Sequence, residues 1–309
     1  MDRGFKLYVM GSSAALPTST RHSTSFVLKH CNNYFLIDCC EGAQIQMRKF
    51  NLPLLKVDHI FISHLHGDHY LGLPGLLLTL HLLGRQKELH VYGPKMLDQI
   101  INPNFSIPEI ELSYKLTFHT ISKGEEIVFS NKLLEVETIE MTHRIETYGF
   151  LFKEKMHKKN IKKDAVERYQ IPISQMASIK NGANLVNPDG SVIPNNELTN
   201  DPPKPLFVAM LGDTAFNTDI IEKVKNADLL YHEATFADDL ATIAEEKYHS
   251  TSRQAATIAS LANVKQMIIG HFSARYKDLM PIVSQAREVF PNTLVAVEGM
   301  VVEVDGFTG

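Results

Sequence analysis

Four residues with metal-binding side chains lie within six positions of the sequence. The stretch "SHLHGDHYLG" places His64, His66, Asp68 and His69 directly after the apolar run "HIFIS" of residues 59–63. Imidazole and carboxylate groups are the ligands that zinc and similar borderline metals prefer. Because the stretch turns off the end of a predicted strand, it can present several donors to one small volume. The pattern therefore predicts a metal site and argues against a polar surface turn.

Three further candidate ligands stand at the same structural position elsewhere in the chain. "LLEVETIEMTH" ends at His143, "LFVAMLGD" at Asp213 and "MIIGH" at His271, and each stretch is an apolar, strand-like run. Taken singly, either histidine has an ordinary pocket or surface interpretation, and Asp213 can cap a turn. Because all three residues follow an apolar run in the same way, their interpretation as metal ligands is favoured. Seven ligands exceed the needs of one tetrahedral ion and predict a two-metal hydrolytic site, which we expect to hold two Zn²⁺ per subunit, with other divalent metals as alternatives.

The residues around these ligands predict sheets covered by helices. Strand-like runs come early in "FKLYVM", "TSFVLKH" and "YFLID", and later in "IEMTH" and "YGFLF". Helical patterns follow in "EGAQIQMRKF", "LPGLLLTLHLL", "SRQAATIASLA" and "DLMPIVSQAREVF". The alternation indicates an α+β fold, with residues 1–309 forming one catalytic domain around strand ends.

Composition limits the classes of protein that fit. The chain has 309 residues, 44% of them hydrophobic, which is enough for a large core. No stretch approaches the ~18 consecutive apolar residues that a membrane span needs, so we expect no membrane association. Cys31, Cys39 and Cys40 cluster too closely for a disulfide framework, and we expect core thiols and a cytoplasmic location.

Residues 153–205 have the composition of an insertion. "KEKMHKKNIKK", residues 153–163, carries six lysines against one glutamate in a chain of net charge −4, and the proline-rich "NPDGSVIPNNELTNDPPKP" follows. If "NIKKDAVERYQI" is helical, Ile161, Ala165 and Tyr169 share one face. Four lysines then remain to meet phosphates: Lys158, Lys159, Lys162 and Lys163. The alternative is a solvated charged loop.

The order of the seven ligands resembles the metallo-β-lactamase superfamily. His64-x-His66-x-Asp68-His69, followed by His143, Asp213 and His271, matches that pattern across nearly the whole chain. The resemblance implies a four-layer αββα sandwich. It also implies that His64, His66 and His143 hold one metal, that Asp68, His69 and His271 hold the other, and that Asp213 bridges them. Such a fold hosts many chemistries.

A second set of motifs consists of "HEATF" (232–236), "HST" (249–251) and "HFSARY" (271–276), with "GSSAALPT" and "LIDCCEGAQIQ" near the start. These motifs resemble those of ribonuclease Z, the endonuclease family that removes the 3′ trailer from precursor tRNA. The resemblance implies that Asp68 is also a proton acceptor. It further implies that Glu233 and His249 deliver a proton to the leaving oxygen and that Arg275 lies near the scissile phosphate. The products would be a 3′-hydroxyl on the tRNA and a 5′-phosphate on the trailer.

The same resemblance gives the insertion a role. Short-type members carry a flexible arm between the third histidine ligand and the bridging aspartate, and this arm clasps tRNA; residues 153–205 occupy that interval. Members are typically homodimers, which the resemblance implies here. Two alternatives differ in class: a small-molecule hydrolase acting on a phosphodiester, thioester or lactone needs no lysine arm, and a catalytically silent RNA-binding relative should have lost ligands.

Overall fold

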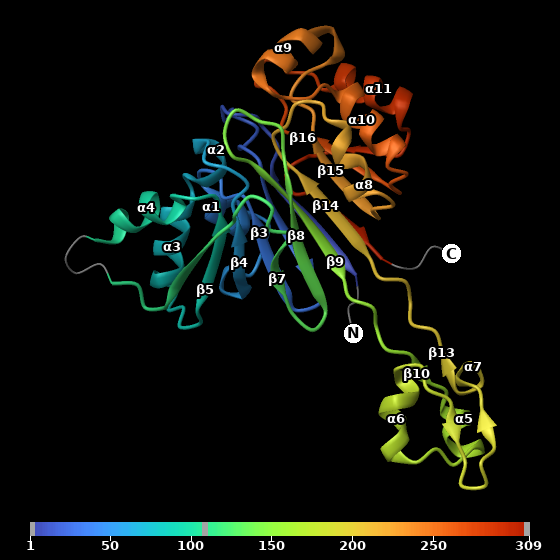
Figure 1. The fold of residues 1–309 in the computed structure, drawn as a ribbon. Coiled ribbons are helices and arrows are strands. Elements are labelled where there is room, and N and C mark those ends of the chain that lie inside the picture. Colours follow the sequence, from blue (N-terminus) through green and yellow to red (C-terminus); the bar gives the residue numbers. More distant parts are fainter. Residues whose placement is uncertain (1–3, 107–110, 306–309) are drawn as a thin grey trace. The chain divides into compact units, whose positions relative to one another are not determined.

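The computed structural model describes residues 4–106 and 111–305. Within these ranges, residues Asn131–Leu134 and Glu154–Pro205 form a smaller compact unit, and the rest forms a larger one. Both units are drawn in Figure 1. None of the described helices combines the length and the apolar character that crossing a bilayer requires.

The first sheet of the larger unit has seven strands in the order β18-β1-β2-β3-β4-β5-β6. Strands β1, β2, β3 and β18 pair antiparallel, whereas β3 to β6 run parallel. The strands are β1 (Phe5–Gly11), β2 (Ser25–His30), β3 (Asn33–Ile37), β4 (Val57–Phe61), β5 (Leu89–Gly93), β6 (Leu116–Thr120) and β18 (Val301–Val304).

The second sheet also has seven strands, in the order β17-β16-β15-β14-β9-β8-β7. Strands β14 to β17 run parallel, and β9 joins β14 antiparallel. The strands are β7 (Ile127–Ser130), β8 (Leu134–Glu140), β9 (Tyr148–Glu154), β14 (Phe207–Leu211), β15 (Leu229–Glu233), β16 (Met267–Gly270) and β17 (Thr293–Val295). The carboxyl ends of parallel strands meet at one edge of a sheet, so residues that follow them are brought together.

Aromatic side chains fill the space between the two sheets. The rings of Phe26 and Tyr231 lie 4.4 Å apart, and Phe35 packs 5.5 Å from Phe152. Each of these pairs joins a strand of one sheet to a strand of the other. Burying such rings contributes ~1.5–3 kcal/mol per side chain, which explains why the sheets stack.

Helices cover the outer face of each sheet. The first sheet buries apolar residues of α1 (Ala43–Lys49), α3 (Leu73–Leu82) and α4 (Leu97–Ile101), and the second those of α8 (Ile221–Val224), α10 (Ser252–Leu261) and α11 (Met280–Val289). The remaining helices of this unit are α2 (Gly67–Tyr70), α9 (Ala241–Lys247), η1 (Leu54–Lys56), η2 (Asn102–Phe105), η3 (Thr218–Ile220) and η4 (Asp238–Leu240). The predicted αββα sandwich is confirmed (Figure 1).

The smaller unit has its own core of Ala165, Ile171, Ile179, Leu185 and Leu198. Its elements are β10 (Asn160–Ile161), α5 (Lys163–Arg168), α6 (Ile173–Lys180), β11 (Leu185–Val186), β12 (Val192–Ile193), α7 (Asn195–Leu198) and β13 (Thr199–Asn200). The helix expected from residue 160 onward therefore begins only at Lys163, because Asn160 and Ile161 pair with β13. The RNA-binding role of residues 153–205 stays a prediction.

Candidate metal centre and cleft

Strand ends bring the predicted ligands together. Strands β4, β8, β14 and β16 end within three residues of His64, His143, Asp213 and His271 respectively. The turn after β4 continues into α2, which carries two further ligands. All seven predicted ligands fall into groups whose donor atoms lie within 4.8 Å of one another.

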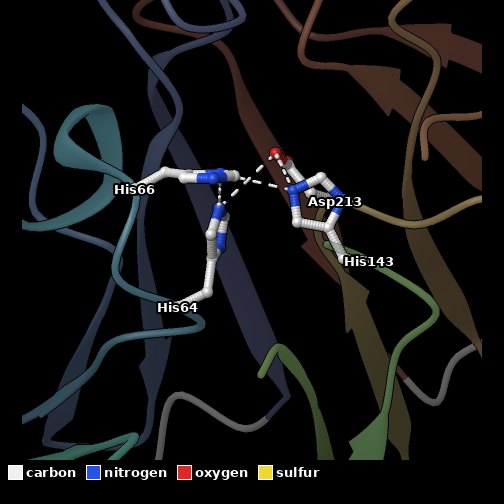
Figure 2. A group of neighbouring side chains, drawn as sticks. All are labelled: His64, His66, His143 and Asp213. Atoms are coloured by element: carbon white, nitrogen blue, oxygen red, sulfur yellow. Dashed lines mark hydrogen bonds and ion pairs between the residues drawn. The ribbon is translucent and has the colours of Figure 1, made fainter. Parts of the chain in front are cut away.

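The first group consists of three histidines and one carboxylate (Figure 2). The His64 Nε2 atom lies 3.0 Å from His66 Nδ1, and His143 Nε2 lies 3.3 Å from the same atom. The Asp213 Oδ2 atom is 3.5 Å from His64 Nε2 and 3.8 Å from His143 Nε2. Four donors thus converge on one small space.

The second group uses the other oxygen of the same aspartate. The Asp213 Oδ1 atom lies 3.1 Å from His271 Nε2 and 3.6 Å from His69 Nε2. Asp68 completes this group, with Oδ2 at 3.2 Å from His69 Nε2. One carboxylate therefore faces both groups, as a bridging ligand requires.

The donor atoms of the second group fit a cation. The Nε2 atoms of His69 and His271 and the Oδ1 atom of Asp213 are buried and have no hydrogen-bond partner among the described residues. Burying three polar atoms without partners costs ~1–3 kcal/mol each. A cation among them removes that cost, and nitrogen and carboxylate donors are those that zinc accepts.

Each of four predicted histidine ligands makes a hydrogen bond through its Nδ1 atom, and this bond fixes the orientation of its imidazole ring. The Nδ1 atoms of His64 and His69 lie 2.9 Å from Ser63 Oγ and 2.7 Å from Asp38 Oδ2. The His143 Nδ1–H donates to the Tyr248 carbonyl at 2.8 Å. The His271 Nδ1 atom lies 2.8 Å from the Thr235 hydroxyl. Such outer contacts orient a ligand and set its tautomer, which leaves Nε2 for a metal.

Asp68 is held in its charged form. Burial alone raises its pKa, but His69 and His271 beside it outweigh burial and lower the pKa of Asp68 far below its usual range. The Ala15 backbone N–H also donates to Asp68 Oδ2 at 3.0 Å. An ionised carboxylate suits both a metal ligand and a proton acceptor.

The predicted Glu233–His249 pair is present beside the metal ligands. Glu233 is fully buried, and its Oε1 atom accepts a hydrogen bond from His249 Nδ1 at 2.7 Å. Burial lowers the pKa of His249, but the Glu233 carboxylate outweighs burial and raises the pKa to about 9. Burial likewise raises the pKa of Glu233, and His249 outweighs it to give about 2. The pair therefore stores a proton on the imidazole.

Part of this site lines a cleft of about 550 Å³. His249 and Arg275 line it together with five of the predicted ligands: His66, Asp68, His143, Asp213 and His271. Arg275 is exposed, its guanidinium lies 5.0 Å above the Phe236 ring, and its Nε donates to Ser273 Oγ at 3.1 Å. An exposed guanidinium that lines the cleft suits a phosphate group.

The four predicted RNA-binding lysines all lie in the smaller unit. Lys158 and Lys163 are exposed, whereas Lys159 pairs with Asp201 at 2.9 Å and Lys162 donates to the Asn196 carbonyl at 3.0 Å. A hollow of about 690 Å³ in this unit is lined by four lysines: Lys158, Lys159, Lys180 and Lys204. Lys180 and Lys204 were not predicted, because each stands alone in the sequence.

Three supporting residues were also missed. Asp38, Ser63 and Thr235 contact the histidines but bind no metal in the predicted set. Asp38 and Thr235 lie inside the motifs "LIDCCEGAQIQ" and "HEATF". Their membership of these motifs was the feature of the sequence that could have pointed to them.

The fold and the two ligand groups define a metal-dependent hydrolase of the metallo-β-lactamase fold. Ribonuclease Z of Bacteroides fragilis strain YCH46 is 43% identical over 301 residues, which are 97% of this chain and 99% of that protein. Ribonuclease Z of Porphyromonas gingivalis strain W83 is 39% identical over 97% of this chain and 99% of its own length. Residues 5–164 match the family model described as anti-Pycsar protein Apyc1, just over half of the chain.

Solved structures agree. Human tRNase Z, short form, superposes with a TM-score of 0.70 at 25% identity, over 97% of this chain and 99% of that one. The metallo-β-lactamase fold protein YhfI of Bacillus subtilis gives the same TM-score at 17% identity, over 98% and 100% of the two chains, and supports the fold. The chain belongs to the ribonuclease Z family, and its residues 5–164 also belong to the family of the Apyc1 model.

Proposed function

We propose that this chain is an endoribonuclease that removes the 3′ trailer from precursor tRNA, leaving a 3′-hydroxyl on the tRNA and a 5′-phosphate on the trailer. The names of its relatives, ribonuclease Z and human tRNase Z, support this substrate. The observation that carries the chemistry is the position of His249. Its ring lies within 4.8 Å of the donor atoms of Asp213 and His271 and is hydrogen-bonded to a buried carboxylate.

We expect the two ligand groups to hold two zinc ions. One ion would be held by His64, His66 and His143. The other would be held by Asp68, His69 and His271, and Asp213 would bind both ions. When bound, two divalent cations lower the pKa of an attacking water and stabilise negative charge on phosphoryl oxygens.

The chain's own residues then move the protons. Asp68, ionised beside His69, accepts the proton of the attacking water. His249, held by Glu233 through Nδ1, donates the proton on Nε2 to the departing ribose oxygen. Arg275, an exposed residue that lines the cleft, would lie near the scissile phosphate. The base, Asp68, thus lies beside two histidines, whereas the acid, His249, is held by a buried carboxylate.

The smaller unit would bind the tRNA body. Its exposed lysines attract phosphates, and such contacts supply much of nucleic-acid affinity. We also expect a homodimer working in the cytoplasm, as the family resemblance implies. Light scattering at working concentration tests the assembly, since a fully active monomer contradicts it.

Incubation with two substrates tests the function. We expect purified, zinc-loaded protein to cut a precursor tRNA at its trailer and to hydrolyse bis-p-nitrophenyl phosphate slowly. End-group analysis should find a 3′-hydroxyl on the tRNA. Hydrolysis of small esters without cleavage of precursor tRNA would instead support the alternative, a small-molecule hydrolase of the same superfamily.

A further inference from the structure

Thr235 places one hydroxyl between three functional groups. Thr235 lies two residues after Glu233, which is the last residue of β15, and Thr235 is 3% exposed. Its Oγ1 atom lies 2.7 Å from Glu233 Oε2, 2.8 Å from His271 Nδ1 and 3.3 Å from His249 Nδ1. The same atom therefore touches the buried carboxylate, a predicted metal ligand and the proton donor.

The directions of these hydrogen bonds follow from the number of protons available. An ionised carboxylate only accepts hydrogen bonds, so the single hydroxyl proton of Thr235 goes to Glu233. The oxygen is then an acceptor toward His271, which means that His271 carries its proton on Nδ1. Its Nε2 atom is left with a lone pair, and that atom is buried without a hydrogen-bond partner among the described residues, 3.1 Å from Asp213 Oδ1.

Glu233 itself is fixed by four donors. Its Oε2 accepts from the Thr235 N–H at 3.0 Å as well as from the hydroxyl, and its Oε1 accepts from the Thr214 N–H at 3.0 Å and from His249 Nδ1. Within the described part of the chain, the Thr235 hydroxyl is the one group that contacts both this carboxylate and the ring of a predicted metal ligand. Removing that hydroxyl leaves the His271 Nδ1–H without an acceptor in a buried site, which costs ~1–3 kcal/mol.

We propose that Thr235 is a positioning residue that couples the second metal group to the proton-delivering pair. It holds His271 in the Nδ1–H tautomer and Glu233 in the orientation that receives His249. The expected effect of Thr235 on tRNA cleavage rests on the proposed function, whereas its effects on the tautomer and on zinc affinity do not.

Two substitutions separate the hydroxyl from the shape of the side chain. Thr235→Val keeps the shape and removes the hydroxyl, and Thr235→Ser keeps the hydroxyl. We expect Thr235→Val to lose zinc affinity by roughly 10–100-fold in competition with a chromophoric chelator. It should also slow diesters with poor leaving groups more than diesters with good ones, and Thr235→Ser should restore both quantities to within a few-fold of the parent. Thr138→Val, at a buried threonine whose hydroxyl donates to the Glu125 carbonyl, is the matched control and should change neither.

Nuclear magnetic resonance of ¹⁵N-histidine-labelled, metal-free parent protein tests the tautomer without any activity. We expect the His271 signal, assigned with a His271→Asn variant, to be that of an Nδ1–H ring. An Nε2–H ring in the parent overturns the proposal even if Thr235→Val fails to fold. Parental zinc affinity and leaving-group dependence in a folded Thr235→Val protein would also overturn it. So would a folded Thr235→Ser protein as impaired as Thr235→Val, because packing and not the hydroxyl would then matter.

Discussion

A buried carboxylate lies at the end of β3 in the first sheet, and another lies at the end of β15 in the second sheet. The two carboxylates accept hydrogen bonds from the same kinds of group. Asp38, just after β3, accepts from the Ser63 hydroxyl at 2.9 Å and from His69 Nδ1, and Ser63 in turn contacts His64. Glu233, at the end of β15, accepts from the Thr235 hydroxyl and from a histidine in the corresponding manner.

The difference lies in what the histidines do. Around Asp38 both histidines belong to the two ligand groups, whereas at Glu233 one is a ligand and the other, His249, is not needed to complete either group. The hydrogen-bonded unit of the first sheet therefore supports two predicted metal ligands, whereas that of the second supports one predicted ligand and the predicted proton donor.

Asp213→Ala should have the largest effect, because Asp213 is the carboxylate that both regions share. We expect the metal content to fall from two ions per chain to one or none, and diester cleavage to fall below detection. Elemental analysis and initial rates measure these. Asp219→Ala removes an exposed carboxylate six residues away and is the control. A stoichiometry of one that Asp213→Ala leaves unchanged would refute the two-metal site.

His249→Ala should break only the second region. We expect a loss of roughly 10²–10⁴-fold on substrates with poor leaving groups, near-parental rates with a good leaving group, and nearly intact metal content. Equal slowing of good and poor leaving groups by His249→Ala would make the acid assignment wrong.

Asp68→Ala should abolish cleavage of every substrate, because it removes a ligand and a proton acceptor together.

Changing Lys158, Lys159, Lys162 and Lys163 to alanine should spare both carboxylate regions. We expect precursor tRNA affinity to fall by orders of magnitude at moderate ionic strength, with a flatter salt dependence, because several phosphate contacts are lost. Hydrolysis of a small diester should stay near the parental rate. The fourfold lysine-to-arginine variant keeps the charge and is the control. Unchanged tRNA processing by the alanine variant would mean that the lysines are only a solvated face.

The smallest effect is expected at a histidine with no buried carboxylate beside it. His59 stacks on His90 at 5.2 Å, and burial, followed by the charge of His90, lowers the pKa of His59 to about 4. The folded state therefore favours neutral His59. Its contribution to stability is present above the unfolded pKa of ~6.5 and is lost as pH falls through 4.

His59→Phe tests that contribution. Between pH 8 and pH 5, we expect the unfolding free energy of the variant to fall by about 1–3 kcal/mol less than that of the parent. Denaturant titrations at both pH values measure the difference, and pH 8 serves as the internal reference. An identical fall in both proteins would show that His59 does not titrate differently on folding.

Much of the site was predictable because histidine and aspartate, the residue types that bind metals, rarely recur at the ends of several apolar strands. Histidine and aspartate after apolar runs predicted the seven candidate ligands, which the structure brings into two groups, and periodicity located the strands and helices that flank them. The family motifs added Glu233 and His249. These features are local in sequence, so no knowledge of packing was needed to find them.

Tertiary structure alone decided the hydrogen bonds around the ligands. Serine and threonine are common residues, and nothing local distinguishes Ser63 or Thr235 from any other until a buried carboxylate and an imidazole approach them. The partner of His143 is a backbone carbonyl, that of Tyr248, which no side-chain pattern reports. Lys159 and Lys162 likewise meet partners more than thirty residues away. The sequence determines which groups can bind metal or carry protons. The pairing of neighbouring strands within each sheet, β3 with β4 and β15 with β16, determines which oxygen faces which ring nitrogen, because these residues come from separate parts of the chain and meet only when the strands pair.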